Sequence, residues 1–578
     1  MSTPYPAQDR SATSSLFRSL PASDRALWLA AGVLCAIYIL YLGLLTSFPL
    51  QDYPNHVARA AVMADLIFHH GARFGHAFGF HFAFVPYLLG DLVMAGGVEL
   101  LGPSAGAAFF STLVLLSLPC ALLLYLRVHN IAPRGQLLIF LLSLYLSTDY
   151  FYWLGFMAYR LAMAAVVVNL ALAQGLRQKG SWTAGVVYCG AIALGYFIHL
   201  TALVFFAAAL GITAVLRVWQ GSSTWRREAM LLLPALVLSA LHFGVVTAEY
   251  GSSDPPSYQY YWGEPRDKLT HVTDEFWRFG GLSATLMMLA LFACLLWPIR
   301  RELWQGGLKK PAVVEQLVLA LFFVGVYLVL PNRYADSSYV DIRALPLTTL
   351  FLLFACLHLA ADSTRARDFG RPAMLAIAAT LGVVNLAYLA RHAQPNDRWI
   401  MRYRQVVAAI PRGATVLPVY TQPKQATLYP FMHVASFAVL DRDAVIPYLF
   451  AADRGDPMKY FRYINRPYTP DEMWYRARAK WRASPERHFA IEGQTYTWRI
   501  SYSQKGRRWQ LLPYIPVDWN QITCTYDYLL VMQPYDRRVI EVSARIVAAN
   551  DSAALLEVDR AQCRPDAPRD PVTQTLGP

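Results

Sequence analysis

The chain has 578 residues, of which 56% are hydrophobic, and its mean hydropathy is +0.31. Several apolar runs reach the roughly 20 residues that a helix needs to cross a bilayer, so the composition indicates a polytopic membrane protein and excludes a soluble globule. The formal net charge of +13 is dispersed over short loops and the C-terminal region, which argues against a nucleic-acid-binding surface. No small-residue cleavage site follows the first apolar run, so we expect no cleaved signal peptide.

Apolar runs predict about eleven membrane-spanning helices, and the loops between them decide the orientation. The expected spans are about residues 27–46, 105–126, 135–148, 154–176, 182–197, 200–219, 229–247, 280–299, 312–330, 344–361 and 372–390. If the N-terminus is cytoplasmic, every basic cluster falls in an inner loop, as the positive-inside rule requires. The clusters consist of Arg127, Arg134, Arg177, Lys179, Arg217, Arg226, Arg227, Arg300, Arg301, Lys309, Lys310, Arg365, Arg367 and Arg371.

One further apolar segment, residues 81–101, contains Asp91 and Glu99. Counting it as a span would move all later basic clusters to the outside, so we expect a juxtamembrane or re-entrant element on the outer face, within a first outer loop of residues 48–104. In this topology several polar groups collect at the outer end of the bundle, although outer loops also have to be polar for solvation alone. These groups are Asp52, Asp149, His199, Glu249, Arg333, Asp341 and Arg343.

The segment that follows the first span carries the clearest functional pattern. Pro54 is expected in the first turn of a helix, where its missing N–H would be unpaired anyway. Along that helix Asp52, His56 and Arg59 lie at positions i, i+4 and i+7 and therefore face the same way. An acid, an imidazole and a guanidinium at a membrane surface suit an anionic, lipid-borne substrate. The alternative is an interfacial helix whose polar face is only solvated.

The next outer turn contains Asp149 at the N-terminus of the following span. Its charge interacts favourably with the helix dipole there, and capping alone is a complete explanation. The functional alternative is a second carboxylate beside Asp52 that steers the acceptor or holds a divalent cation. Arg160 lies nearly two turns into that span, where an unpaired charge costs at least a few kcal/mol. We therefore expect an aspartate or a bound phosphate as its partner.

Three later positions complete the set of candidate residues. His199 interrupts a long apolar run and marks a tight outer turn, where it is either a hydrogen-bonding residue at a helix end or a catalytic group. Arg333 and Arg343 lie close to the bilayer in an outer loop, and arginine forks match phosphate oxygens. Arg343 also begins a span, where the helix dipole disfavours a cation, so it needs an anion nearby. Pairing with Asp341 or Asp336 is the alternative to a lipid phosphate.

The hydropathy drops after Arg391, which predicts two domains: a transmembrane domain of residues 1–394 and a soluble α/β domain of residues 395–578 on the outer side. Helical spacing at 399–410 and β-rich runs at 414–420 and 528–532 support the mixed class. Aromatic and basic residues are dense at 250–277 and 453–480, which suits contact with sugars or with lipid headgroups. Cys524 and Cys563 could form a disulfide in an oxidising periplasm.

Together these features resemble the GT-C superfamily of membrane glycosyltransferases, which use sugars linked to polyprenyl phosphate. The resemblance rests on the cytoplasmic N-terminus, an acid in a long first outer loop, a second acid in the next outer turn, many spans and a C-terminal outer domain. It implies a mainly α fold, a multi-pass protein of the bacterial inner membrane, and a periplasmic C-terminal domain. Asp52 matches the first-loop catalytic acid, Asp149 the second-loop acid, and Arg343 the late arginine directed at the lipid phosphate.

The resemblance implies an inverting glycosyltransferase that moves a sugar from a polyprenyl-phosphate donor to a glycan, lipid or protein acceptor. Asp52 would be the general base, and arginines would stabilise the departing phosphate. The expected substrate-binding residues are His56, Arg59, Arg160, His199, Arg333, Asp341 and Arg343. The chain lacks the Asp-Glu pair and the Asp-x-Asp form found in some branches, so a divalent cation such as Mg²⁺ or Mn²⁺, held by Asp52, Asp149 or His56, stays open. The alternatives are a transporter or flippase of a lipid-linked saccharide and a non-catalytic scaffold for polysaccharide assembly.

Overall fold

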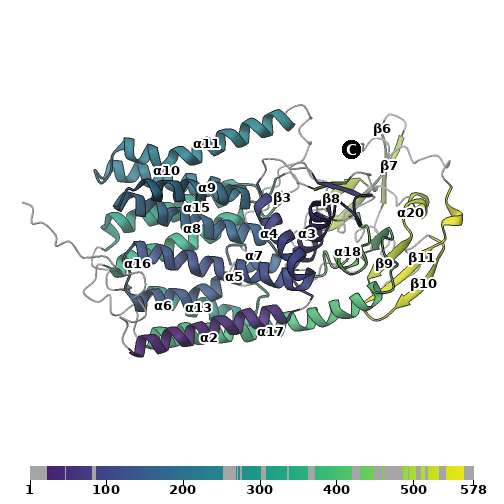
Figure 1. Cartoon of the computed structure of the whole chain (residues 1–578), viewed down its shortest axis with the longest axis horizontal. Helices are drawn as coiled ribbons and strands as arrows, with labels where there is room; N and C mark the ends of the chain where they lie inside the picture. Colours follow the sequence, from purple (N-terminus) through teal and green to yellow (C-terminus); the bar gives the residue numbers. More distant parts are fainter. Residues whose placement is uncertain are drawn as a thin grey trace, which may run out of the picture.

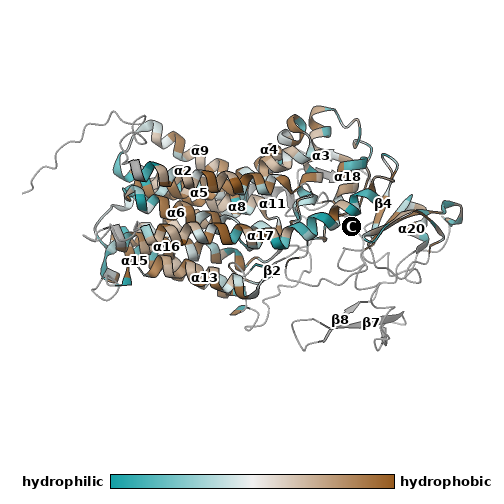
Figure 2. Ribbon diagram, turned by 90° about the horizontal axis from the view of Figure 1, so that it is seen from below, coloured by the Kyte–Doolittle hydropathy of each residue, from teal (hydrophilic) through white to brown (hydrophobic). Residues whose placement is uncertain are grey.

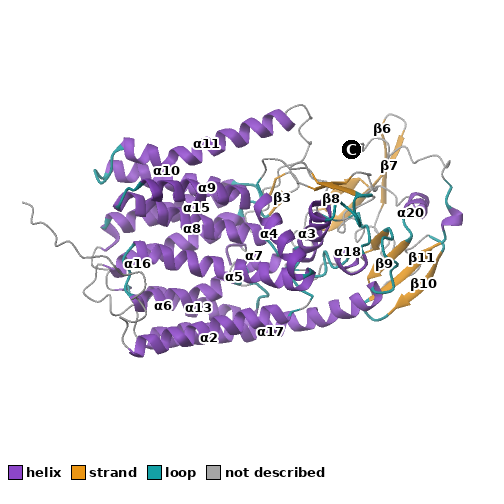
Figure 3. Ribbon diagram, in the orientation of Figure 1, coloured by secondary structure: helices purple, strands orange, loops and turns teal. Residues whose placement is uncertain are grey.

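A bundle of long helices forms one end of the protein, and most of the strands lie at the other end (Figures 1 and 3). This computed structural model describes residues 22–250 except 46 and 81–85, residues 268–361 except 270, 274, 275, 277, 298, 301–306, 335 and 336, and residues 372–449 except 420–427, 429 and 448. Further along the chain it describes residues 458–460, 486–491, 494–502, 509–513, 519–532 and 542–564.

The helices of the bundle coincide with the spans expected from the sequence. Within the described residues, nine helices are long and apolar enough to cross a membrane, and two shorter apolar helices, α9 and α13, lie beside them. The bundle is the apolar part of the molecule in Figure 2. Its helices are α2 (Ala22–Leu44), α5 (Pro103–Val128), α6 (Pro133–Ser147), α8 (Met157–Gln178), α9 (Trp182–Ile198), α10 (Leu200–Trp219), α11 (Trp225–Tyr250), α13 (Gly281–Leu296), α15 (Pro311–Val329), α16 (Leu345–Ala361) and α17 (Pro372–Val407).

Prolines mark the beginning of several of these helices. The first turns of α5, α6 and α15 each contain one, at Pro103, Pro133 and Pro311. The fixed φ of proline suits a helix start, and its missing N–H leaves no bond unmade there. The same rule places Pro54 in the first turn of α3 (Tyr53–Phe68), as the sequence predicts.

The segment of uncertain topology forms a short helix, α4 (Leu88–Leu101), which packs on α3 and α5 outside the main bundle (Figure 1). Its 14 residues are fewer than a bilayer crossing needs, and it is not among the helices long enough to span. The chain turns back sharply at Gly102, and a Cβ on Gly106 would lie 2.6 Å from the backbone of Gly97. Glycine is therefore required at Gly106 for α4 and α5 to approach so closely.

The C-terminal region contains a mixed sheet in the order β10-β11-β9-β4. Its strands are β4 (Val416–Val419), β9 (Tyr528–Met532), β10 (Ala544–Ala549) and β11 (Ala553–Val558). Strand β4 is parallel to β9, and the other pairs are antiparallel. A second sheet of β6 (Glu486–Ile491), β7 (Gln494–Tyr502) and β8 (Trp509–Pro513) is antiparallel. The expected combination of a helical bundle with a C-terminal mixed region is thus confirmed.

Three further features concern how the C-terminal region is held. Helix α17 continues without a break from the bundle through residue 394 to Val407, where the sheet begins nearby (Figure 1). Strand β1 of the first loop (Phe78–Phe80) pairs antiparallel with β5 (Met458–Tyr460). Cys524 and Cys563 form a disulfide between α20 (Trp519–Thr525) and the chain just after β11. The first loop and the C-terminal region therefore share a boundary.

Candidate active site

Asp52 is the N-cap of α3, and α3 lies at the end of the bundle that faces the C-terminal region (Figure 1). Its backbone is fixed by two hydrogen bonds to the next outer segment: the N–H of Gln51 donates to the carbonyl of Trp153 at 3.1 Å, and the N–H of Asp52 donates to the carbonyl of Leu154 at 3.0 Å. The side chain of Asp52 is 14% exposed to solvent. The carboxylate is thus rigidly mounted and still reachable.

Gly155 makes this contact possible. Its φ is +84°, and a Cβ at this position would lie 2.6 Å from the backbone N of Tyr53 and 2.9 Å from that of Asp52. Both the left-handed conformation and the close approach require a residue without a side chain. The local sequence therefore folds the segment around Gly155 directly against the start of α3.

His433 is the side chain that contacts the Asp52 carboxylate from the C-terminal region. Its Nε2 lies 3.5 Å from Oδ1 of Asp52, and its Nδ1 lies 3.1 Å from Nδ2 of Asn55. His433 is 7% exposed and Asn55 is fully buried. Burial lowers the pKa of His433 to about 4. Since the Asn55 amide donates to Nδ1, the neutral ring carries its hydrogen on Nε2, toward Asp52.

The other two residues of the expected polar face have different surroundings. Burial, together with the charge of Arg59 and the nearby His433, holds the pKa of His56 well below its usual value, so His56 is neutral at pH 7. Arg59 forms a buried ion pair with Asp91 of α4, with Nη2 2.6 Å from Oδ2. Burial raises the pKa of Asp91, and Arg59 opposes that rise. The Arg59 guanidinium therefore ties α3 to α4.

Asp149 and Arg160 form a second buried pair. Nη1 of Arg160 lies 2.7 Å from Oδ2 of Asp149, and both side chains are 3% exposed. Asp149 also accepts a hydrogen bond from the N–H of Tyr152 and caps the short helix α7 (Tyr150–Leu154). The expected turn at 149–153 is therefore a separate helix, and α8 begins only at Met157, so Arg160 lies in its first turn and not two turns in. Of the two expected partners for Arg160, the structure contains the aspartate.

Arg343 is part of an aromatic cluster at the same end of the bundle. Its guanidinium lies 5.2 Å from the ring centroid of Phe156 and 6.0 Å from that of Tyr159. The hydroxyl of Tyr159 donates to the backbone carbonyl of Arg343 at 2.7 Å. Phe156 directly follows Gly155, which contacts the backbone of Asp52. The segment 154–156 thus lies between the Arg343 and Asp52 positions and links them.

His199, Asp341 and Arg333 have local roles in the structure. His199 alone separates α9 from α10, and its Nδ1 accepts the N–H of Thr201 at 3.1 Å, so the expected tight turn and helix-end hydrogen bond are confirmed. Asp341 is fully buried, with Lys268 Nζ 3.4 Å away, a partner that the sequence did not suggest. Arg333 begins the short strand β2 (Arg333–Tyr334), and its side chain, like residue Asp336, lies outside the described part.

The expected metal ligands do not converge in the part of the chain that the structure describes. Within it, no group of three or more His, Cys, Asp and Glu side chains could hold a metal ion. Asp149 is paired with Arg160 at the beginning of the short helix α7. Asp52 contacts the other end of α7, where its N–H donates to the carbonyl of Leu154. The possible divalent cation stays a prediction.

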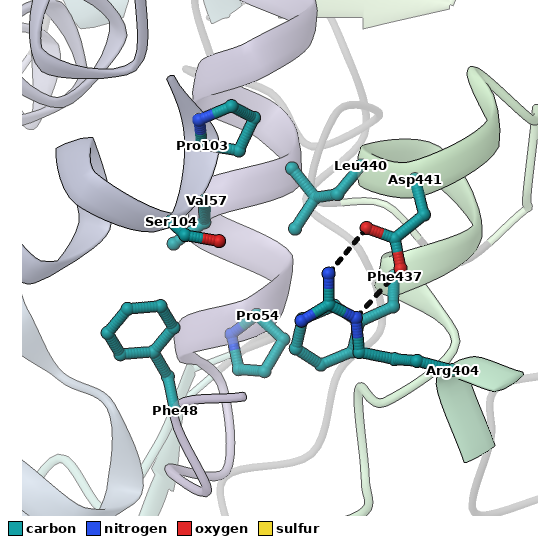
Figure 4. A pocket seen from close by; sticks show the side chains of 9 residues that line it. All are labelled: Phe48, Pro54, Val57, Pro103, Ser104, Arg404, Phe437, Leu440 and Asp441. Atoms are coloured by element: carbon teal, nitrogen blue, oxygen red, sulfur yellow. Dashed lines mark hydrogen bonds and ion pairs between the residues drawn. The ribbon is translucent and has the colours of Figure 1, made fainter. Parts of the chain in front are cut away.

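A small pocket opens beside the start of α3 (Figure 4). Pro54 and Val57 of α3 form one side, and Phe437 of α18 (Ser436–Arg442) forms another. Arg404 and Asp441 close it with a two-pronged ion pair at 2.7 and 2.8 Å. The pocket lies between the first loop and the C-terminal region, and its lining residue Pro54 is two residues after Asp52.

Most of the chain has the fold of ArnT, a protein of known structure. The crystal structure of apo ArnT from Cupriavidus metallidurans matches with a TM-score of 0.51 at 12% sequence identity, over 92% of this chain and 99% of that chain. The crystal structure of the same protein bound to undecaprenyl phosphate matches with a TM-score of 0.49 at 12% identity, over 92% and 97%. No protein-family model and no curated protein matches the sequence. The chain therefore has an ArnT-like fold, which agrees with the expected polytopic helical bundle followed by a C-terminal α/β region.

Proposed function

We propose that the protein is a glycosyltransferase of the bacterial inner membrane that transfers a sugar from a polyprenyl-phosphate donor to a glycan, lipid or protein acceptor in the periplasm. The observation that carries the proposal is the position of Asp52 on a fold shared with ArnT. Helix α3, whose N-cap is Asp52, lies between the helical bundle and the C-terminal sheet (Figure 1), and the carboxylate is partly exposed and contacts His433 of the C-terminal region. A lipid-linked donor and a water-borne acceptor would meet at such a boundary.

Asp52 is the general base in this proposal. The acceptor hydroxyl attacks the anomeric carbon, its proton passes to the Asp52 carboxylate, and the bond from the anomeric carbon to the phosphate oxygen breaks. The electron pair of that bond leaves with the polyprenyl phosphate, and direct displacement inverts the anomeric centre. A hydrogen bond from His433 Nε2 would keep the carboxylate ionised, as a base must be before the reaction.

Arg343 is proposed to stabilise the departing phosphate. Its guanidinium is half-buried over the rings of Phe156 and Tyr159, an environment where a charge interaction is stronger than in water. Arg59 and Arg160 are engaged by Asp91 and Asp149. That pairing supports positioning roles for these two arginines, with Asp149 holding α7 in place.

The remaining expected residues are proposed to bind or position the donor without taking part in proton transfer. His56 and His199 are proposed to line the donor site from α3 and from the turn before α10. Asp341, two residues before Arg343 and next to Lys268, is proposed to hold the arginine-bearing segment, and Arg333 to contact phosphate from β2. A divalent cation on Asp52, His56 or Asp149 is tested by assaying the protein in EDTA and after addition of Mg²⁺ or Mn²⁺.

The deciding experiment is sugar cleavage by purified protein in lipid nanodiscs. The probes are undecaprenyl-phosphate glucose and undecaprenyl-phosphate mannose, with an extract of bacterial envelope lipids and glycans as acceptor, and the readout is released undecaprenyl phosphate. Wild type is expected to release it and Asp52→Asn is not. Asp551→Asn is the matched control, because Asp551 is 61% exposed on the C-terminal surface.

The same experiment separates the alternatives. A transporter or flippase would move the labelled donor across a vesicle membrane without cleaving it, and a scaffold for polysaccharide assembly would neither move nor cleave it. Cleavage that survives in Asp52→Asn would reject the assigned base. No cleavage of either donor by wild type would contradict the transferase.

A further inference from the structure

His433 is the only C-terminal side chain with a described ion-pair contact to the candidate base, and nothing in the sequence pattern pointed to it. We propose that His433 is a positioning residue for Asp52: its Nε2–H orients the carboxylate and keeps it ionised, so that the C-terminal region completes the reaction centre. This inference rests on the proposed function of Asp52. It assigns a part in catalysis to a region that the sequence suggests only as a surface for sugars or headgroups.

The geometry gives His433 two distinct contacts, one for each ring nitrogen. Nδ1 faces Nδ2 of Asn55 at 3.1 Å, and Nε2 faces Oδ1 of Asp52 at 3.5 Å. An amide nitrogen only donates, so Nδ1 must accept, and the hydrogen of the neutral ring must lie on Nε2. Asn55 thus selects the tautomer that presents a donor to Asp52. The separation of 3.5 Å would close to a normal hydrogen bond with a small movement.

The ring is held by its own packing. Val434, the next residue, is fully buried, and the ring of Phe431 lies 4.3 Å from that of Trp399 on α17. The following helix α18 packs against α3. Around this core, Arg73 of the first loop pairs with Asp443 at 3.2 Å. The His433 ring is therefore fixed relative to α3 by contacts on both sides of it in the chain.

The charged and titratable groups around the pair determine how it responds to pH. On α3 these are Asp52 itself, His56 and Arg59, and Arg59 is paired with Asp91 of α4. On the C-terminal side, Arg404 and Asp441 are paired with each other next to Pro54. Burial keeps the pKa of His433 near 4, so the ring is a neutral donor throughout the range in which Asp52 must be ionised.

Two amide substitutions separate the two ring nitrogens. His433→Gln places its NH₂ near the position of Nε2 and can still donate to Asp52, whereas His433→Asn reaches only the position of Nδ1 near Asn55. In the cleavage assay we expect kcat of His433→Asn to fall about tenfold, the effect of losing one hydrogen bond to a charged group, with KM for the donor changed less than about twofold. His433→Gln is expected to stay within about threefold of wild type.

The pH profile of kcat/KM is the readout that a merely structural role would not move. Loss of the donor disfavours ionised Asp52, so the acidic limb for His433→Asn is expected to move up by about one pH unit, while that for His433→Gln stays near wild type. His69→Gln is the control for an imidazole elsewhere in the first loop, since the side chain of His69 is 50% exposed, and it is expected to leave the limb in place. Equal profiles for the Asn and Gln variants would overturn the inference, as would a rise in KM at unchanged kcat.

A thermal-unfolding cycle tests the contact without any activity. The changes in unfolding free energy caused by Asp52→Asn and His433→Asn are expected to be non-additive, with a coupling equivalent to about tenfold in the unfolding equilibrium constant. The changes caused by Asp551→Asn and His433→Asn are expected to be additive. If the two substitutions are non-additive but the wild-type protein cleaves no donor, the proposed function is refuted and the Asp52–His433 contact stands. Cleavage that depends on Asp52, combined with additivity, would refute only the role of His433.

Discussion

The two acidic segments at the end of the bundle next to the C-terminal region hold their carboxylates in opposite ways. Asp149 is 2% exposed and engaged by an arginine and a backbone N–H. Asp52 is partly exposed and faces a neutral histidine. A buried carboxylate with a cationic partner is held in place and closed to an acceptor molecule, whereas a reachable carboxylate with a neutral donor can act as a base. Two aspartates in similar sequence settings are therefore suited to different tasks.

The largest expected effect separates these tasks directly. Asp52→Asn removes the proposed base, so sugar cleavage is expected to fall by about 10²–10⁴-fold, the usual contribution of general base catalysis. Because the side chain is partly exposed, the melting temperature is expected to change little. The measurement is donor cleavage alongside thermal unfolding in the same nanodiscs. A large loss of stability would show that Asp52, like Asp149, is a structural carboxylate.

Arg160→Met is expected to produce the converse result. It leaves the Asp149 carboxylate buried without its cation, which costs about 3–5 kcal/mol of unfolding free energy. The double variant Asp149→Leu with Arg160→Met is expected to recover much of that loss, because an apolar pair of similar volume can replace a buried ion pair. Thermal unfolding of the three variants is the measurement. A stable Arg160→Met variant that has lost activity would instead favour direct phosphate binding by Arg160.

Gly155→Ala tests the contact between the two acidic segments. The added Cβ meets the backbone of Asp52 and Tyr53, and the position has φ +84°. We expect a loss of about 2–4 kcal/mol of unfolding free energy, from left-handed strain together with overpacking. Gly244→Ala is the matched control, because nothing lies within 4 Å of a Cβ there. Equal melting temperatures for the two variants would show that the two segments are not in close contact.

The smallest expected effect is a dependence of stability on pH. In the unfolded chain His433 takes up a proton below pH 6.5, whereas burial keeps it neutral in the folded protein down to about pH 4. The unfolded state thus binds more protons in this window, so stability falls as the pH falls, by about 2 kcal/mol at pH 5 from His433 alone. The measurement is the melting temperature of wild type and His433→Gln from pH 7 to pH 5. Parallel curves would show that His433 is not held neutral.

The features that the sequence predicted well are those with a strong and local physical cause. A bilayer crossing needs about 20 apolar residues, so the helix positions agree with the expected spans. Loop charge also excluded a crossing at residues 81–101, where the structure has the short helix α4. The tight turn at His199 also followed from its place in a long apolar run.

The contacts that were not predicted depend on tertiary structure. His433 is 378 residues from Asn55 in the chain, and no spacing rule connects the two. Asp91 was informative only for topology, yet it is the partner of Arg59, which the sequence assigned to a phosphate. Lys268 next to Asp341 is a similar case. A sequence pattern identifies which residues share a helix face, but the packing of α3 against α4 and the C-terminal region decides which partners they have.

Helix α17 has a mechanical consequence for the whole molecule. Its 36 residues would extend about 54 Å as one rigid strut from the bundle to the sheet. Because this helix is continuous, the C-terminal region cannot rotate freely relative to the bundle, and any motion that moves His433 away from Asp52 has to bend α17. Bending is easiest at Pro395, where the helical hydrogen-bond ladder lacks one donor. The stiffness of α17 around Pro395 would then set how readily the C-terminal region moves away from α3.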